Sequence, residues 1–149
     1  MIHVKPETST LYAEAVGPKQ PAIAYPEVGS SLEPAAMIEE LTHKVCTPCR
    51  GGVPPLTREE AARYLGLVQG WELLDDARRI ERTYRFRSFR EALAFVHDVG
   101  ALAEAEGHHP DLYLTWGKVG VEVMTHVIGG LSENDFILAA KLDEARSRA

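Results

Sequence analysis

Residues 104–110 read E-A-E-G-H-H-P, and the elements predicted on either side are arranged around this stretch. Gly107 is placed to end a helix in a left-handed conformation, and Pro110 restricts His109 to an extended backbone. His108 and His109 therefore follow directly on a helix end, although from an extended segment they cannot both point the same way. Because the unperturbed pKa of imidazole lies near neutrality, histidines in such a setting are suited to proton transfer at pH 7.

The segment before this stretch is predicted to be the strongest helix of the chain. Ser88-Phe89-Arg90-Glu91 has the form of a capping box that opens the helix. Helical spacing defines an apolar stripe of Phe89, Ala92, Leu93, Val96, Val99, Leu102 and Ala103.

Glu104 and Glu106 occupy the last turn of this helix, where the helix dipole disfavours carboxylates. Two explanations are open for them. Solvent can screen them on an exposed face, or Glu104 can pair with a histidine of the following turn and orient its ring.

The segment after the histidines predicts a hairpin. Residues 112–116 and 119–125 alternate around a Gly117-Lys118 turn, with Val119, Val121 and Val123 forming the apolar face. Strict alternation places His126 on the opposite face or at the strand rim.

A last helix is predicted to begin after Gly129-Gly130, with Ser132 as N-cap and Asp135 at its third position. Residues 136–140 (FILAA) are apolar all round, which in a chain of this size favours burial between subunits. We therefore expect a homo-oligomer.

Before residue 88 the chain predicts one more helix and one more hairpin. Thr57 and Glu60 form a capping box, and Gly70 is placed to end that helix. Residues 71–74 and 78–87 flank an Asp75-Asp76 turn and alternate as a half-buried antiparallel hairpin. The predicted domain of residues 57–149 thus runs α-β-β-α-β-β-α.

The first 56 residues differ from this domain. Residues 1–36 hold five of the nine prolines without apolar periodicity, which predicts an extended or disordered arm. Residues 37–56 form a turn-rich lead-in with the pattern H-x-x-C-x-x-C at His43, Cys46 and Cys49. The pattern is half of a zinc or redox site, or a pair of reduced cysteines. Since structural zinc needs four ligands and no second such motif exists, we expect no metal site within one chain.

Composition narrows the function classes. The chain has 149 residues, 45% of them hydrophobic, and a formal net charge of −6. This charge argues against nucleic acid or an anionic membrane surface as the main partner, because both require clustered Lys and Arg. No apolar run approaches the roughly 20 residues that span a bilayer, and no secretory signal begins the chain, so we expect a cytoplasmic protein.

Several of these motifs together resemble the pterin-4a-carbinolamine dehydratases. The resemblance rests on E-x-x-x-H-H-P-D at residues 104–111, L-Y-L-T-W-G-K-V-G-V-E-V at 112–123, Thr125-His126, and G-L-S-E-N-D at 130–135. The C-T-P-C-R-G-G-V-P-P-L-T lead-in and G-W-E-L-L at 70–74 look like bacterial members. Similarity covers Cys46 to Ala145.

The resemblance implies an α+β fold, a four-stranded antiparallel sheet with three helices packed on one face, in dimers or tetramers. The implied reaction is loss of water from a 4a-hydroxytetrahydropterin, giving the quinonoid dihydropterin and so recycling the cofactor of aromatic amino acid hydroxylases. The pterin is the substrate, and no metal or other cofactor is implied. Some relatives instead serve as dimerisation partners of a transcription factor, so a protein-binding module without significant dehydratase activity is the alternative.

Residue roles are carried over by position. The resemblance implies that His108 and His126 are acid/base groups and that His109 orients the pterin. Candidates to orient the rings are Glu104 and Asp135, although Asp135 can also be a simple helix-start acid, and Pro110 and Thr125 are candidates to shape the pocket. Two positions depart from the family pattern: Leu112 stands where many relatives carry an aromatic residue, and Asn134 where several carry a basic one.

Overall fold

A computed structural model describes residues 34–47 and 51–148, which belong to one compact unit. Most of the predicted arm of residues 1–36 lies outside the described residues, and so does Cys49 of the C-x-x-C pattern. The elements of the described chain are α1 (Pro34–His43), α2 (Arg58–Leu65), β1 (Glu72–Leu74), β2 (Arg79–Arg85), α3 (Phe89–Glu106), β3 (Asp111–Thr115), β4 (Lys118–Val123), the 3₁₀ turn η1 (His126–Ile128) and α4 (Glu133–Arg148).

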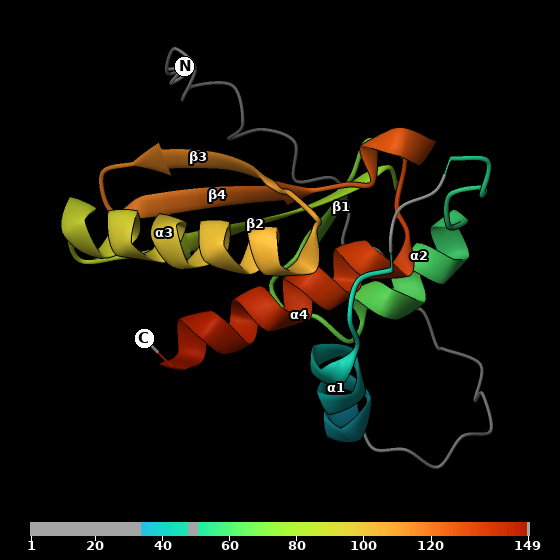
Figure 1. Cartoon of the computed structure of the whole chain (residues 1–149), viewed down its shortest axis with the longest axis horizontal. Helices are drawn as coiled ribbons and strands as arrows, with labels where there is room; N and C mark the ends of the chain where they lie inside the picture. The colour runs from blue at the N-terminus through green and yellow to red at the C-terminus, as the bar shows by residue number, and fades with distance from the viewer. Residues whose placement is uncertain (1–33, 48–50, 149) are drawn as a thin grey trace, which may run out of the picture. The chain divides into compact units, whose positions relative to one another are not determined.

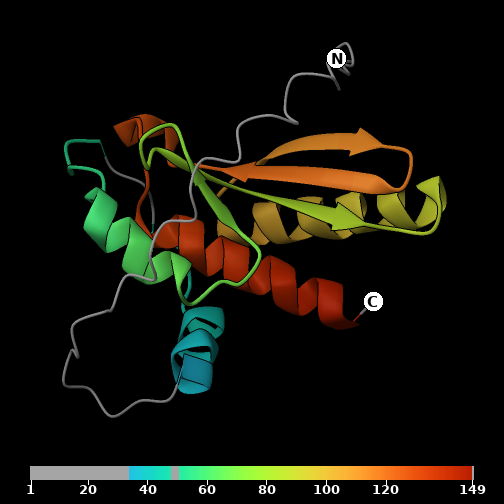
Figure 2. The same ribbon diagram turned by 180° about the vertical axis from the view of Figure 1, so that it is seen from behind.

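The four strands form one antiparallel sheet in the order β1-β2-β4-β3 (Figures 1 and 2). Both predicted hairpins are confirmed, and β2 and β4 pair in the centre. The side chains of Ile80, Tyr84, Val119, Val121 and Val123 alternate onto the buried face. This alternation is the period-two pattern that the sequence predicted.

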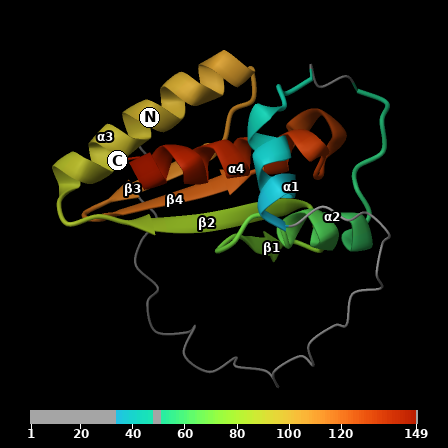
Figure 3. The same cartoon turned by 90° about the horizontal axis from the view of Figure 1, so that it is seen from below.

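Helices α3 and α4 lie against the same face of the sheet (Figures 1 and 3). Their inner side chains close the core with the strands, and Phe136 of α4 stacks on Tyr64 of α2 with ring centroids 5.1 Å apart. The α+β class and the antiparallel sheet with helices on one face are therefore confirmed.

The predicted number of three helices is wrong, because α1 is a fourth. It begins at Pro34, inside the predicted arm, and continues into the predicted lead-in, and it packs on the side of α4 that faces away from the sheet (Figures 1 and 3). Residues Asn134 to Ala140 are all buried within the single chain. The apolar circumference of α4 therefore requires no second subunit, so this argument for a homo-oligomer does not hold.

The predicted helix starts at Thr57 and Ser88 and the predicted helix end at Gly107 are confirmed, although Glu91 accepts from the Arg87 amide instead of completing a capping box with Ser88. Thr57 and Glu60 form both bonds of a capping box, Ser88 accepts from the Glu91 amide, and Gly107 ends α3 at φ +64°. Two further predictions differ from the structure. Helix α2, however, ends at Leu65 rather than continuing to Gly70, because the chain turns at Gly66 with bonds three residues apart. On α3, the predicted stripe residues Phe89 and Leu93 remain 45% and 50% exposed, whereas Ala92, Val99 and Ala103 of the same stripe are buried.

Within the described residues, none of the helices combines the length and the apolar character needed to cross a lipid bilayer.

Candidate functional site

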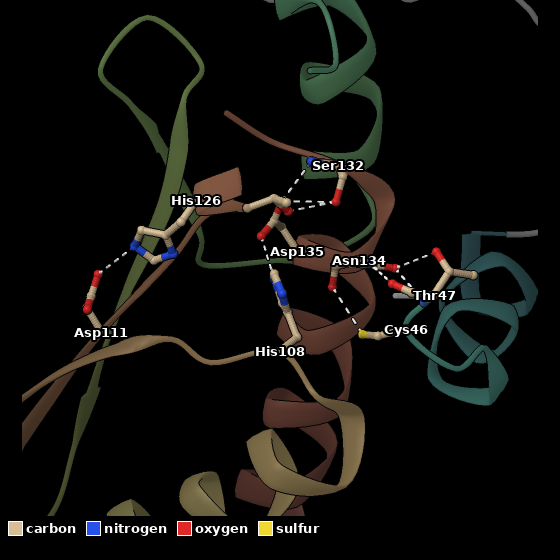
Figure 4. A network of polar contacts seen from close by, with 9 residues as sticks. Cys46, Thr47, His108, Asp111, His126, Ser132, Asn134 and Asp135 are labelled. Atoms are coloured by element: carbon tan, nitrogen blue, oxygen red, sulfur yellow. Dashed lines mark hydrogen bonds and ion pairs between the residues drawn. The ribbon is translucent and has the colours of Figure 1, made fainter. Parts of the chain in front are cut away.

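His108 and Asp135 form a buried pair where α3 ends and α4 begins. The His108 Nε2 atom lies 2.7 Å from Asp135 Oδ1, with 6% of His108 and none of Asp135 exposed (Figure 4). The left-handed conformation at Gly107 turns the chain at the end of α3, and the His108 amide caps this end by donating to the Ala103 carbonyl. The carboxylate thereby restricts the imidazole to one orientation.

The second oxygen of Asp135 is occupied by the start of α4 and the end of the β4 segment. Oδ2 accepts from the Ser132 amide at 2.7 Å and from Thr125 Oγ1 at 2.8 Å. One oxygen of Asp135 therefore caps the start of α4, and the other lies within hydrogen-bond distance of His108. Thr125, expected to shape a pocket, is buried and fixes the carboxylate.

His109 points away from His108, as expected for neighbours in an extended segment. Its Nε2 atom lies 2.7 Å from Glu104 Oε1, and both side chains are largely exposed. Of the two explanations for Glu104, the structure therefore supports pairing with a histidine. Glu104, His109, Pro110 and Leu112 line a cavity of about 480 Å³ beside α3.

His126 lies on the outer side, as strand parity predicted. Strand β4 ends at Val123, Thr125 turns inward and bridges Gly130, and η1 directs His126 toward solvent. The His126 Nε2 atom is 3.7 Å from Asp111 Oδ2, at the start of β3 (Figure 4). His126 is therefore not re-aimed toward the helices. It contacts the segment that carries His108 only through Asp111, which follows that segment at the start of β3.

Each of the three histidines consequently faces a carboxylate of its own. The pairs His108–Asp135, His109–Glu104 and His126–Asp111 all involve the short connection between α3 and β3 or the residues at its ends. One pair is buried and two are exposed, so this end of the sheet offers both a rigidly held imidazole and solvent-accessible ones. Such a set can donate and accept protons at neutral pH.

A second cavity adjoins the buried carboxylate. It measures about 520 Å³ and has mainly apolar walls, including Leu56, Ile128 and Leu131, with Thr125 and Ser132 at its polar end. Cavities of 300 to 1,000 Å³ accommodate small-molecule ligands. Both this cavity and the one at His109 have the size for a bicyclic ligand.

The metal or redox alternative for the lead-in involves a residue outside the described range. Among residues 34–47 and 51–148, no three His, Cys, Asp or Glu side chains are grouped to hold a metal ion. His43 Nδ1 donates a local bond to the Glu39 carbonyl at 2.7 Å, and Cys46 is buried. Cys49, the last residue of the H-x-x-C-x-x-C pattern, lies outside the described residues.

The sequence predicts no part in the site for two polar residues that the structure places there. Asp111 is the last residue of the E-x-x-x-H-H-P-D motif, and in the structure it is the carboxylate at His126. Ser132 was predicted only as a helix cap, yet its amide and hydroxyl both contact Asp135 Oδ2. The hairpin register that sets Asp111 opposite Glu122, four residues before His126, is the signal that could have revealed the first contact.

Comparisons with known proteins show which family this sequence is similar to. The sequence model of the family described as Pterin 4 alpha carbinolamine dehydratase matches residues 54–145. A provisionally named pterin-4-alpha-carbinolamine dehydratase of Methylococcus capsulatus is 58% identical over 109 residues, 73% of this chain and 96% of that protein. Its counterpart in Azoarcus sp. is 55% identical over 108 residues, 72% of this chain and 92% of that protein.

A solved structure is also similar. The protein from Brucella melitensis, described as a transcriptional coactivator/pterin dehydratase, superposes with a TM-score of 0.58 at 30% identity, covering 60% of this chain and 96% of that one.

Proposed function

Because the chain belongs to the pterin 4 alpha carbinolamine dehydratase family, we propose that it removes water from a 4a-hydroxytetrahydropterin to give the quinonoid dihydropterin. The product would re-enter the redox cycle of a pterin that serves aromatic amino acid hydroxylases. The observation that carries this proposal is the buried His108–Asp135 pair at the end of the sheet that also bears His126 and His109.

The reaction requires two proton transfers. A general acid protonates the 4a oxygen, the C4a–O bond breaks as the N5 lone pair moves toward C4a, and a base accepts a ring proton. In our proposal His108 and His126 supply the acid and the base, and positioned imidazoles contribute about 10² to 10⁴ to the rate of such steps. The proton given to the 4a oxygen is balanced by the one taken from the ring, and no electrons leave the substrate, so the proposed steps consume no oxidant or reductant.

The remaining residues would position these groups and the substrate. Asp135, fixed by Thr125 and the Ser132 amide, holds the His108 ring, and Asp111 lies beside the His126 ring. His109, oriented by Glu104, would hold the pterin next to Pro110, which lines the same cavity. Leu112, in place of an aromatic residue, would give this cavity an aliphatic wall.

The test is direct assay of the purified protein on a 4a-hydroxypterin at pH 7, with and without a metal chelator. We expect acceleration over the uncatalysed reaction that the chelator does not change. His108→Ala and His126→Ala should each lose about 10² or more of the rate while the fold is retained. The matched control is His43→Ala, an exposed histidine of α1, which should keep full activity. Full activity in both site variants would refute the assignment.

We also propose that the protein forms a homodimer or homotetramer through α3. Phe89 and Leu93 are one helical turn apart, share a face and are about half exposed. Such exposed apolar pairs mark contact surfaces more often than isolated ones do. Sedimentation should give a dimer or tetramer for the parent protein and smaller species for the Phe89→Ser/Leu93→Ser variant, whereas a monomeric parent protein would refute this part.

The same face supports a second candidate function. It could bind a different protein, as the description of the Brucella melitensis relative as a transcriptional coactivator allows. A stable heterologous complex lost in the Phe89→Ser/Leu93→Ser variant, together with no dehydratase activity in the parent protein, would favour this candidate over the enzyme.

A further inference from the structure

Cys46 and Thr47, in the middle of the lead-in, are held against α4 by the side chain of Asn134. The Thr47 amide donates to Asn134 Oδ1 at 3.0 Å, and Asn134 Nδ2 donates to the Thr47 carbonyl at 2.7 Å (Figure 4). These two bonds in opposite directions require a side chain that carries both an acceptor and a donor, as a carboxamide does. Asn134 is 6% exposed, so little water competes for these groups.

The other side of the same segment is held by α3. The Cys46 amide donates to Glu106 Oε2 at 3.0 Å, and Glu106 Oε1 pairs with Lys141 of α4. Both side chains of this ion pair are largely buried, at 10% and 13% exposure. Backbone and side chains thus connect the end of α3, the lead-in and the start of α4.

Both anchors adjoin the buried His108–Asp135 pair in the chain. Asn134 immediately precedes Asp135, and only Gly107 separates Glu106 from His108. A closed ring of contacts results: Asn134 to Thr47, Cys46 to Glu106, along the chain to His108, and across to Asp135. The ring therefore includes both residues of the buried pair.

The carboxamide of Asn134 is needed for both bonds to Thr47. Lys and Arg side chains have donors only, so in this position they could not accept a bond from the Thr47 amide. The ring therefore depends on a side chain at position 134 that both accepts and donates.

We propose that Asn134 is a positioning residue that, through Cys46–Thr47 and Glu106, sets the geometry of the His108–Asp135 pair. The proposal rests on the proposed dehydratase function for its kinetic consequence. Its structural consequence, a fixed hydrogen bond between His108 and Asp135, is independent of any activity. A misplacement of about 1 Å can cost up to 10² in rate, so even a partial opening of the ring is measurable.

The kinetic test compares Asn134→Ala with Glu133→Gln. Glu133 is the preceding residue and accepts a bond from Lys44, which follows α1. Glu133→Gln therefore weakens another contact between the segment before α2 and α4, but one that does not belong to the ring. We expect Asn134→Ala to lower kcat about tenfold with KM changed by less than about twofold, and Glu133→Gln to leave both unchanged. Equal losses of kcat in the two variants would mean general loosening and would overturn the proposal.

A double-mutant cycle tests the ring itself. Asn134→Ala and Glu106→Gln open the same ring at two points, so the double variant should lose little more kcat than the worse single variant. Additive losses would show independent effects and contradict the proposal. If Asn134→Ala fails to fold, Asn134→Asp takes its place, because it keeps the acceptor for the Thr47 amide and replaces the donor with a carboxylate oxygen that repels the Thr47 carbonyl.

A second readout needs no substrate. The Nε2 proton of His108, identified by its loss in Asp135→Asn, should give a nuclear magnetic resonance signal that shifts or broadens in Asn134→Ala and stays in place in Glu133→Gln. If the parent protein is inactive but this pattern is found, the proposed function fails and the positioning role stands. An unchanged signal in Asn134→Ala overturns the positioning role, whatever the activity.

Discussion

The Nε2 atom of His108 and the Oδ1 atom of Asp135 lie 2.7 Å apart although 27 positions separate the two residues. One residue follows the C-terminal end of α3, and the other belongs to the first turn of α4. The pair therefore depends on the packing of two helix ends, and the second carboxylate oxygen is already bound by Thr125 and Ser132. The following predictions concern this pair and the contacts that support it.

Asp135→Asn should remove catalysis while it preserves most of the fold. The carboxamide oxygen can still accept from Thr125 and the Ser132 amide, but its NH₂ group then faces His108 Nε2 and imposes the other tautomer. An equivalent change at a buried Asp–His pair costs about 10⁴ in kcat in a serine protease, and we expect at least about 10² here. Steady-state assays with thermal melting check this, and Glu144→Gln, on the same helix, is the control. A variant with near-normal kcat would show that the orientation of His108 does not limit the reaction.

Glu104→Gln should have a much smaller effect than Asp135→Asn, because the Glu104–His109 pair is exposed to solvent. Exposed pairs contribute little, so we expect KM to rise by less than about fivefold with kcat nearly constant. Substrate titration under identical conditions gives both constants. A large fall in kcat would instead assign His109 to the chemical step.

The surroundings of Glu106 should make the stability of the protein depend on pH below about 4.5. Burial is the largest single influence and raises the pKa of the Glu106 carboxyl, but the bond from Lys141, the Cys46 amide and the Lys141 charge together lower it below its usual 4.5. A lowered pKa in the folded state gives stabilisation that is fully present above pH 4.5 and is lost as pH falls through the lowered value.

Urea unfolding at several pH values compares the parent protein with Glu106→Gln. The difference in unfolding free energy between them should be largest above pH 4.5 and should shrink at lower pH. A difference that stays constant across this range would mean that Glu106 is not stabilised as a carboxylate.

A polar cluster around Asp143 should contribute to stability without affecting the chemistry. Asp143 of α4 accepts from Tyr84 Oη at 2.5 Å and from Trp71 Nε1 at 3.1 Å, and pairs with Arg82 at 2.8 Å. Tyr84→Phe should cost about 1 kcal/mol of unfolding free energy, and Asp143→Ala about 3 kcal/mol, because it leaves buried donors without an acceptor. Chemical unfolding measures both.

Asp143 titrates with the opposite sign to Glu106. Burial is the largest cause and raises the pKa of the Asp143 carboxyl above the usual 3.8. The folded protein therefore binds this proton more tightly than the unfolded chain, and the contribution of Asp143 to the free energy of unfolding falls as pH rises from 3.8 through the raised value. This slope should disappear in Asp143→Asn. Its persistence would assign it to another group.

Much of the fold follows from short-range signals in the sequence. Capping residues at Thr57 and Ser88, the glycine at position 107 and the alternation of Val119, Val121 and Val123 act through backbone bonds and side-chain direction within a few residues. These signals therefore predicted both hairpins, three of the helices and the outward direction of His126. The family motif likewise identified the histidines, because it lies in consecutive or ordered positions of the chain.

Only the tertiary structure decided which of these residues meet. The packing of α1 on α4, the contact of Asp111 with His126 and the bonds of Asn134 to Thr47 join segments that are not neighbours in the sequence. The exposure of Phe89 and Leu93 likewise depends on which elements pack on α3. Periodicity states that a residue has an apolar or polar side, but the partner on that side is selected by long-range packing. For that reason the sequence determined the elements and the three imidazoles, whereas packing decided that His108 is the buried one and Asp135 its partner.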